Sequence, residues 1–302
     1  MRSKPVIITL IILIALLIGF LTFRSVLISG KQQAGFDGQR ALEFVEKQVA
    51  FGPRITGTEG QARMLVWLEE SLAKDGWNTE IQTGEMLKHP ISNLIAKRGE
   101  GNPWIVLGAH YDTRMVADRD PDPQNRTLPV PGANDGASGV AVLLELAHVI
   151  PSQIPGQVWL VFFDAEDNGD IPGWDWILGS RYFVENLKTY PDAAIIVDMV
   201  GDADLNIFVE RNSDLTLVLQ IWGQAATLGY ATYFVPIFKH SLIDDHSPFL
   251  WASIPAVDII DFDYPYWHTL EDTPDKVSAD SLQVVGNTLL TWLVGYLANK
   301  SP

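Results

Sequence analysis

Three carboxylates follow directly on the most apolar run of the chain. Asp164, Glu166 and Asp167 come immediately after residues 158–163, a run with the length and composition of a buried strand in a mostly parallel sheet. Sheets of this kind place their chemistry at the carboxyl ends of the strands. Carboxylates this close repel one another, so the pattern indicates a bound cation or a shared proton, unless the segment is a solvated acidic turn.

Histidines and further carboxylates occupy equivalent places after other predicted strands and before one predicted helix: His110 and Asp112 after 104–110, Asp198 after 193–197, His268 after 255–260, and Asp135 before 140–150. Taken singly, such a histidine is more often an ordinary core or surface residue, and such an aspartate is more often a helix cap. Together, imidazole and carboxylate ligands suit a catalytic Zn²⁺ site with an open position. Asp112 lies two residues past His110 on the same strand face and could orient its imidazole.

Composition narrows the chemistry further. The 302 residues include no cysteine, so a metal can be held only by Asp, Glu and His, and a disulfide framework is excluded. The formal net charge of −16 gives no electrostatic support for binding nucleic acid or an anionic membrane surface. With 47% hydrophobic residues the chain can bury a large core, and we expect a single catalytic domain.

The elements that position these residues alternate along the chain. We expect strands at 77–83, 93–97, 104–110, 158–163, 193–197, 205–209 and 255–260, with helices at 40–49, 58–72, 140–150, from 180, 215–228 and 278–297. Thr58 is expected to cap the second helix, and Asp244 or Asp245 a short helix near 246. The alternation predicts an α/β fold, a three-layer sandwich with a central mixed, mostly parallel sheet. Residues 114–131 are rich in Asp and Pro and form a loop long enough to serve a site.

The amino end carries a separate signal. Residues 5–23 are apolar with no charge before Arg24, close to the length that crosses a hydrocarbon core, and no clear cleavage site follows. We therefore expect residues 1–30 to form a cytoplasmic stub and one transmembrane helix. Residues 31–302 form the catalytic domain, placed outside the cytoplasm by the basic residues Arg2 and Lys4.

Five motifs, in order along residues 37–298, resemble the zinc aminopeptidase family that also contains the glutaminyl-peptide cyclotransferases: Gly-Ala-His110-Tyr-Asp112, Gly-Ala-Asn-Asp135-Gly-Ala-Ser-Gly, Asp-Ala-Glu166-Asp167, Asp198-Met-Val-Gly and Trp267-His268-Thr. The resemblance implies a mixed sheet of six to eight strands with zinc at its carboxyl edge.

Two branches of that family remain open. For the two-metal aminopeptidases, the resemblance implies Glu166 as the base that activates water and ligands at five positions: His110, Asp135, Asp167, Asp198 and His268. Asp135 would bridge the two metals. For the cyclotransferases, it implies one zinc on Asp135, Asp167 and His268, with Glu166, Asp198 and Asp244 as the acid and hydrogen-bonding set. Asp112 and His246 are expected to support these residues from outside the site.

Three details favour the cyclotransferase branch: Asp-Asp-His-x-Pro-Phe at 244–249, Trp267 directly before His268, and Trp174 and Trp176 after the acidic pair. Cyclising a glutamine needs a dry pocket with rigid apolar walls, which Trp174, Trp176 and Trp267 would provide, although ordinary core packing is their alternative role. Asp167 departs from the many relatives that carry Glu at this position.

We therefore expect a zinc-dependent enzyme that converts the amino-terminal glutamine of peptides or proteins to pyroglutamate and releases ammonia. One zinc is expected for this acyltransferase, and two for the alternative, an aminopeptidase that hydrolyses amino-terminal peptide bonds. A third reading is an ectodomain that binds without catalysis.

Overall fold

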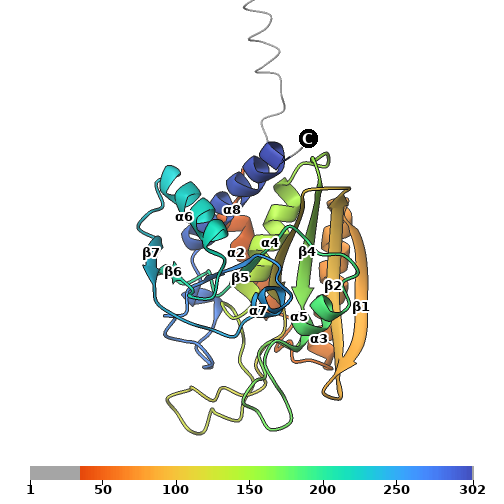
Figure 1. Ribbon diagram of the computed structural model, residues 1–302. Helices are drawn as coiled ribbons and strands as arrows, with labels where there is room; N and C mark the ends of the chain where they lie inside the picture. Colours follow the sequence, from red (N-terminus) through yellow and green to blue (C-terminus); the bar gives the residue numbers. More distant parts are fainter. Residues whose placement is uncertain (1–34, 301–302) are drawn as a thin grey trace, which may run out of the picture. The chain divides into compact units, whose positions relative to one another are not determined.

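The chain folds around a six-stranded sheet (Figure 1), and the strand order is β1-β2-β4-β3-β5-β8. The computed structural model describes residues 35–300. The six strands are β1 Asn78–Met86, β2 His89–Gly99, β3 Trp104–His110, β4 Gln157–Phe163, β5 Ala193–Asp198 and β8 Ala256–Ile260. The last four run parallel to one another, whereas β2 is antiparallel to β4 and β1 to β2. The sheet is mixed and mostly parallel, as predicted.

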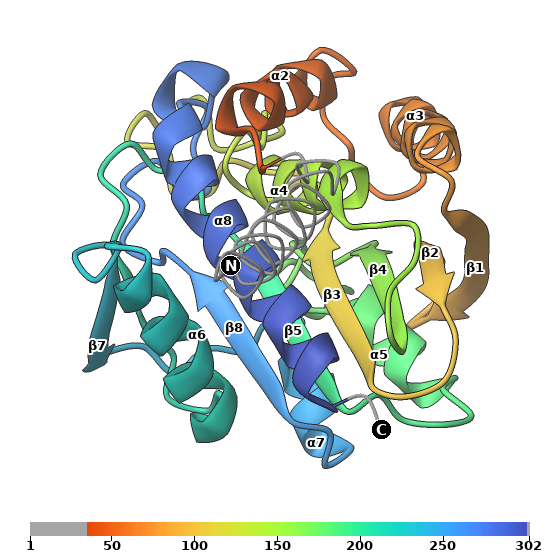
Figure 2. The same cartoon turned by 90° about the horizontal axis from the view of Figure 1, so that it is seen from above.

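Helices cover both faces of this sheet (Figure 2). One face packs on α2 Gly38–Val49, α3 Glu59–Lys74, α4 Ala137–Val149 and α8 Ala279–Lys300, and the other on α5 Leu178–Glu185 and α7 Ser247–Trp251. Alternation along the strands explains the two cores. In β3, for example, Leu107 packs with the first set of helices and Val106 with the second. Within residues 35–300 the fold is therefore three-layered.

Smaller elements complete the described chain. Strands β6 Ile207–Val209 and β7 Phe234–Phe238 pair in a separate parallel ribbon, α6 Leu215–Thr227 packs against β7 and α8, and a short 3-10 helix spans Pro274–Lys276. The sequence did not predict β7. Thr58 caps α3 as expected, because its hydroxyl accepts a hydrogen bond from the backbone N–H of Gln61.

The expected cap of α7 is wrong. His246 occupies the N-cap of α7 and no side chain caps the helix. The carboxylates of Asp244 and Asp245 are instead buried and belong to the surroundings of the candidate site described below.

The parallel register brings the chemistry to one edge. His110 at the end of β3 pairs with Phe163 at the end of β4, and Asp198 at the end of β5 pairs with Ile260 at the end of β8. The four parallel strands thus end level with one another. Side chains carried on or just past these ends must converge, because neighbouring strands lie only about 5 Å apart.

The predictions for the amino end concern residues that lie outside the described ones. These are the transmembrane helix at 5–23, the stub and anchor at 1–30, and the domain boundary after residue 30. Among residues 35–300, no helix combines the length and the apolar character needed to cross a membrane.

Candidate metal centre and active site

Asp135, Asp167 and His268 meet at the carboxyl edge of the sheet, and we call them the metal-ligand group. One ligand atom of each lies within 4.8 Å of the others, and all three side chains are buried. The imidazole Nε2 of His268 lies 2.9 Å from Asp167 Oδ1 and 3.8 Å from Asp135 Oδ2. Three distant segments supply them: the start of α4, the turn after β4 and the long connection after β8.

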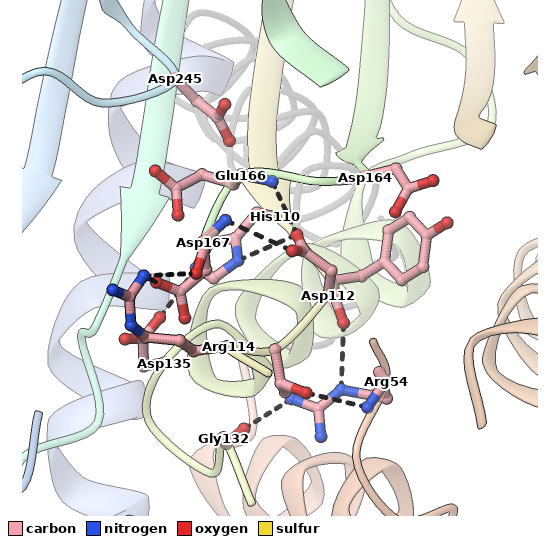
Figure 3. Close-up of polar contacts among 12 residues, drawn as sticks. Arg54, His110, Asp112, Arg114, Gly132, Asp135, Asp164, Glu166, Asp167 and Asp245 are labelled. Carbon is pink, nitrogen blue, oxygen red and sulfur yellow. Dashed lines mark hydrogen bonds and ion pairs between the residues drawn. The ribbon is translucent and has the colours of Figure 1, made fainter. Parts of the chain in front are cut away.

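A second group shares one of these residues. His110 Nε2 lies 3.1 Å from Asp135 Oδ1 and 3.1 Å from Asp198 Oδ1, so His110, Asp135 and Asp198 form another set that could hold a metal. Asp135 stands between the two groups. Figure 3 shows His110, Asp135 and Asp167 converging from their separate segments. All five residues that the sequence singled out as ligands thus come together.

The residues present fit a bound divalent cation. Burial and the nearby charge of Asp135 raise the pKa of Asp167 to about 6, and Asp167 Oδ2 is buried without a hydrogen-bond partner in the described part of the chain. A buried, unpaired carboxylate oxygen is costly unless a cation compensates it. Nitrogen and oxygen donors without sulfur suit Zn²⁺, so we conclude that these positions can hold it.

Asp112 ties the two strand ends together. Its carboxylate accepts hydrogen bonds from the backbone N–H groups of Glu166 (3.0 Å) and Asp167 (3.3 Å), and Oδ1 lies 3.5 Å from His110 Nδ1 (Figure 3). The contact with His110 is the one expected from their spacing. The two backbone contacts were not foreseen, and they fix the turn that carries Glu166 and Asp167.

Asp135 is held by residues that the sequence did not single out. Asp272 accepts hydrogen bonds from the backbone N–H groups of Asn134 (2.8 Å) and Asp135 (3.2 Å). The buried guanidinium of Arg54 donates to the carbonyl oxygens of Tyr111, Pro131 and Gly132, and thereby fixes the preceding loop (Figure 3). A signal for Asp272 existed, since it lies four residues after His268. Arg54 offered none beyond its turn-rich surroundings.

A pocket of about 260 Å³ opens beside the metal-ligand group. Glu166, Asp198 and Asp244 line it together with the rings of Trp176 and Trp267. Burial raises the pKa of Glu166 well above its usual range, and the negative charges of neighbouring carboxylates, Asp244 among them, raise it further. Burial together with the charge of Asp198 raises the pKa of Asp244 to about 7. The pocket therefore holds carboxyl groups able to exchange protons near neutral pH.

Two of the three candidate tryptophans line the pocket, and one does not. Trp176 stacks over His268 with ring centroids 6.1 Å apart, and Trp267 stacks on the same imidazole at 3.8 Å. Trp174 does not line the pocket. It stacks on His89 at 3.5 Å and packs with the buried side chains of Ala165 and Leu178. Its expected place in the substrate pocket is therefore not observed, because the indole stacks on His89 instead.

His246 lies behind Asp244 rather than beside the metal-ligand group. Its Nε2 is 3.2 Å from Glu210 Oε2 and its Nδ1 is 3.6 Å from Asp258 Oδ2, and all three side chains are buried. A ligand atom of Asp244 lies within 4.8 Å of those of His246 and Asp258. His246 thus lies among buried carboxylates, behind the one that faces the pocket.

Asp164, the first of the three clustered carboxylates, turns away from the others. It accepts hydrogen bonds from the hydroxyl of Thr56 (2.8 Å) and the backbone N–H of Ser92 (2.9 Å). Only Glu166 and Asp167 of that cluster reach the pocket. The residue between them and Asp164, Ala165, has a φ of 53°, and this left-handed turn sends the carboxylates in different directions.

Comparison with known proteins agrees with this geometry. The sequence model of peptidase family M28 matches residues 93–293, a span that contains all of the candidate ligands. The chain belongs to this family. Members of M28 include peptidases as well as glutaminyl cyclases, so membership shows the fold but does not by itself decide the reaction.

The proteins similar to this chain include both glutaminyl cyclases and an exopeptidase. Glutaminyl cyclase from Porphyromonas gingivalis superposes with a TM-score of 0.82 at 34% identity, covering 87% of this chain and 100% of that one. A Zn-dependent exopeptidase from Parabacteroides distasonis superposes with a TM-score of 0.82 at 31% identity, covering 87% and 99%. Glutaminyl-peptide cyclotransferase of Drosophila melanogaster is 25% identical over 276 residues, 77% of this chain and 75% of that protein.

Proposed function

We propose that this M28 protein is a zinc-dependent glutaminyl-peptide cyclotransferase, an acyltransferase that converts amino-terminal glutamine to pyroglutamate and releases ammonia. The observation that carries the proposal is the pocket of about 260 Å³, in which the metal-ligand group adjoins the buried Glu166 and two tryptophan rings. The similarity to the Porphyromonas gingivalis glutaminyl cyclase supports the same reading.

The tryptophan walls favour cyclisation over hydrolysis. Trp176 and Trp267 line the pocket with rigid apolar faces, at a low cost in conformational entropy. A glutamine side chain confined by these faces folds back toward its own α-amine, which raises the effective concentration of the two reacting groups. The same walls keep out water, the competing nucleophile.

Asp135, Asp167 and His268 would hold the zinc ion, which would supply Lewis acidity at the side-chain amide carbonyl of the glutamine. Glu166 accepts a proton from the α-amine, and the amine nitrogen forms a bond to the amide carbon. Glu166 then delivers the proton to the amide nitrogen as the carbon–nitrogen bond breaks, and ammonia leaves. A raised pKa of Glu166 suits both halves of this transfer, because the group must gain and lose a proton near neutral pH.

Asp198 and Asp244 complete the pocket wall next to Glu166. Their negative charges attract the amino group of the substrate, and Asp244 also helps to raise the pKa of Glu166. A substrate panel tests this assignment: a glutaminyl peptide, a leucyl peptide and an alanyl peptide are incubated with the purified chain. The proposal predicts loss of the mass of one ammonia molecule from the glutaminyl peptide alone. Release of free leucine or alanine would identify a peptidase instead.

One observation favours a second candidate, the two-metal aminopeptidase. His110, Asp135 and Asp198 form a second set of residues that could hold a metal, and Asp135 belongs to both sets. In that enzyme Glu166 would activate a water molecule. Metal analysis separates the candidates, since the cyclotransferase is expected to retain one zinc per chain and the peptidase two.

We also propose that the apolar residues 5–23 anchor the chain in a membrane with the M28 domain outside the cytoplasm. The support is their length and lack of charge. Fractionation of cells that express the full chain tests this proposal. Recovery of the protein, with its amino end intact, in the soluble fraction would contradict it.

A further inference from the structure

The loop between β3 and α4 lies against the segment that carries His268. Residues 114–120 of this loop make the contacts. The backbone N–H of Arg119 donates to the carbonyl oxygen of His268 (3.2 Å), and Asp120 Oδ2 accepts a hydrogen bond from the backbone N–H of Leu270 (3.0 Å). The guanidinium of Arg119 also lies over the ring of Trp267, 5.3 Å from its centroid. The 114–120 segment therefore contacts the chain at His268 and at residues just before and just after it.

His268 needs such support. Its φ of 57° lies in the left-handed region, which is sterically unfavourable for a residue with a Cβ. A conformation of this kind persists only where the surroundings determine it. The contacts with Arg119 and Asp120 fix the backbone on either side, but they leave the rotation of the ring itself undetermined.

The side chain of Asp118 reaches the ring. Its Oδ1 lies 3.3 Å from His268 Nδ1, on the opposite side of the imidazole from Nε2, which faces Asp167 at 2.9 Å. One ring nitrogen thus faces the metal-ligand group and the other faces a carboxylate outside it. Asp118 is 40% exposed, so water would compete for its oxygens if nothing else held them.

Arg114 holds Asp118 in place. Its Nε and Nη2 donate hydrogen bonds to the two oxygens of Asp118 at 2.9 and 2.8 Å. This bidentate arrangement fixes the orientation of the carboxylate. Its Nη1 donates to the backbone carbonyl oxygen of Asp167 at 2.9 Å. The guanidinium is buried under the ring of Trp176, 5.2 Å from the centroid, and Figure 3 shows it beside Asp135 and Asp167. Arg114 therefore connects Asp118 to the backbone of a second ligand.

We propose that Asp118, fixed by Arg114, is a positioning residue for His268: the negative charge of its carboxylate, 3.3 Å from Nδ1, favours the proton on that nitrogen, so that the lone pair of Nε2 points into the metal-ligand group. The inference rests on the zinc site proposed above and is the same for a cyclotransferase and for a peptidase. A carboxylate behind a histidine ligand fixes the tautomer and the ring orientation and makes the nitrogen more basic. Removing such a partner lowers metal affinity about 10–100-fold.

The test measures metal binding rather than turnover. Zinc affinity of the full chain is determined by competition with a chelator, and the visible absorption of the cobalt-loaded chain reports the ligand geometry. Asp118→Ala is expected to weaken zinc binding about 10–100-fold and to change the cobalt spectrum. Asp118→Asn retains an acceptor oxygen and is expected to lie between Asp118→Ala and the parent chain.

Asp122→Ala is the matched control, because it removes one negative charge from the same loop at an exposed side chain whose described contact is the backbone N–H of Gln124. It is expected to bind zinc as the parent chain does. Equal zinc affinity and equal cobalt spectra for Asp118→Ala and the parent would overturn the inference, and so would an equal loss in Asp118→Ala and Asp122→Ala. A parent chain that binds zinc without cyclising glutamine would refute the proposed reaction and leave this inference intact.

Discussion

At the scale of single residues, Glu166 is the group on which the proposed chemistry depends. It is 7% exposed, its backbone N–H is held by Asp112, and its side chain faces a pocket that contains further carboxylates. Burial and those charges favour its protonated form. A raised pKa makes the Glu166 carboxylate a stronger base toward the amine, and the same group then returns the proton to the amide nitrogen as an acid.

Replacing Glu166 by Gln removes the exchangeable proton and leaves the shape nearly unchanged. We expect the turnover number on a glutaminyl peptide to fall by about 10²–10⁴-fold, with zinc content unchanged. Steady-state kinetics with parallel metal analysis measures both quantities. Turnover at the parent rate would refute the role of Glu166 in either candidate reaction.

The residues at the ends of buried strands were predictable, and so was the contact of Asp112 with His110, whereas the supporting residues from distant segments were not. His110, Asp167 and Asp198 follow strongly apolar runs, and the sheet must bring such positions together. Asp118 contacts His268, which lies 150 residues later in the sequence. Asp272 contacts the backbone of Asp135, which lies 137 residues earlier. No local pattern records a contact of that kind.

At the scale of elements, turns explain where the sequence and the structure differ. Strand β2 begins at His89, four residues before the predicted start, because β1 and β2 form a hairpin whose turn residues Leu87 and Lys88 both have positive φ. Such turns normally carry Asn or Gly, so the signal was missing. Strand β7 contains Pro236, which argues against a strand, yet it lies at the edge of a two-stranded ribbon where a proline is tolerated.

The loop after β4 positions Trp176 through a glycine. A Cβ on Gly169 would overlap the indole ring of Trp176, so the ring lies directly on the backbone there. We expect Gly169→Ala to displace this pocket wall and to raise the KM for a glutaminyl peptide about tenfold or more, since small misplacements in a site are costly.

Gly223→Ala serves as the control, because it adds the same methyl group within α6 where no other atom lies within 4 Å. It is expected to leave KM unchanged and to raise stability by up to about 1 kcal/mol. Equal KM values for Gly169→Ala and the parent would show that Trp176 does not wall the substrate pocket.

At the scale of the whole molecule, the strong excess of acidic residues appears also away from the metal-ligand group. Asp261, just after β8, is 1% exposed, and its oxygens accept hydrogen bonds from the backbone N–H groups of Asn206 and Asp263. Burial, with the nearby charges of Asp202 and Asp263, raises its pKa from 3.8 to about 7. Between those two pH values the folded chain binds more protons at Asp261 than the unfolded chain does.

The free energy of unfolding therefore falls as pH rises through this window, by on the order of 1 kcal/mol for each unit of pKa difference. Asp261→Asn removes this dependence, so the variant should gain stability relative to the parent chain between about pH 5 and about pH 8. Thermal unfolding of both chains at the two pH values measures the difference. A difference that does not change with pH would contradict the raised pKa.

The mixed, mostly parallel sheet with helices on both faces was predictable from alternating apolar strands and helices, because layered packing is how such elements bury their apolar faces. The reaction was harder to read, since a cyclotransferase and an aminopeptidase use the same ligand positions on the same fold. The difference lies in which bond of a bound glutaminyl residue is broken.

One measurement decides that question directly. A glutaminyl peptide with an isotopically labelled side-chain amide nitrogen is incubated with the zinc-loaded chain, and the label is followed by mass spectrometry. Cyclisation predicts that the label leaves as ammonia while the peptide keeps all its residues and ends in pyroglutamate. Labelled free glutamine, with a peptide shortened by one residue, would contradict the account and assign the site to an aminopeptidase.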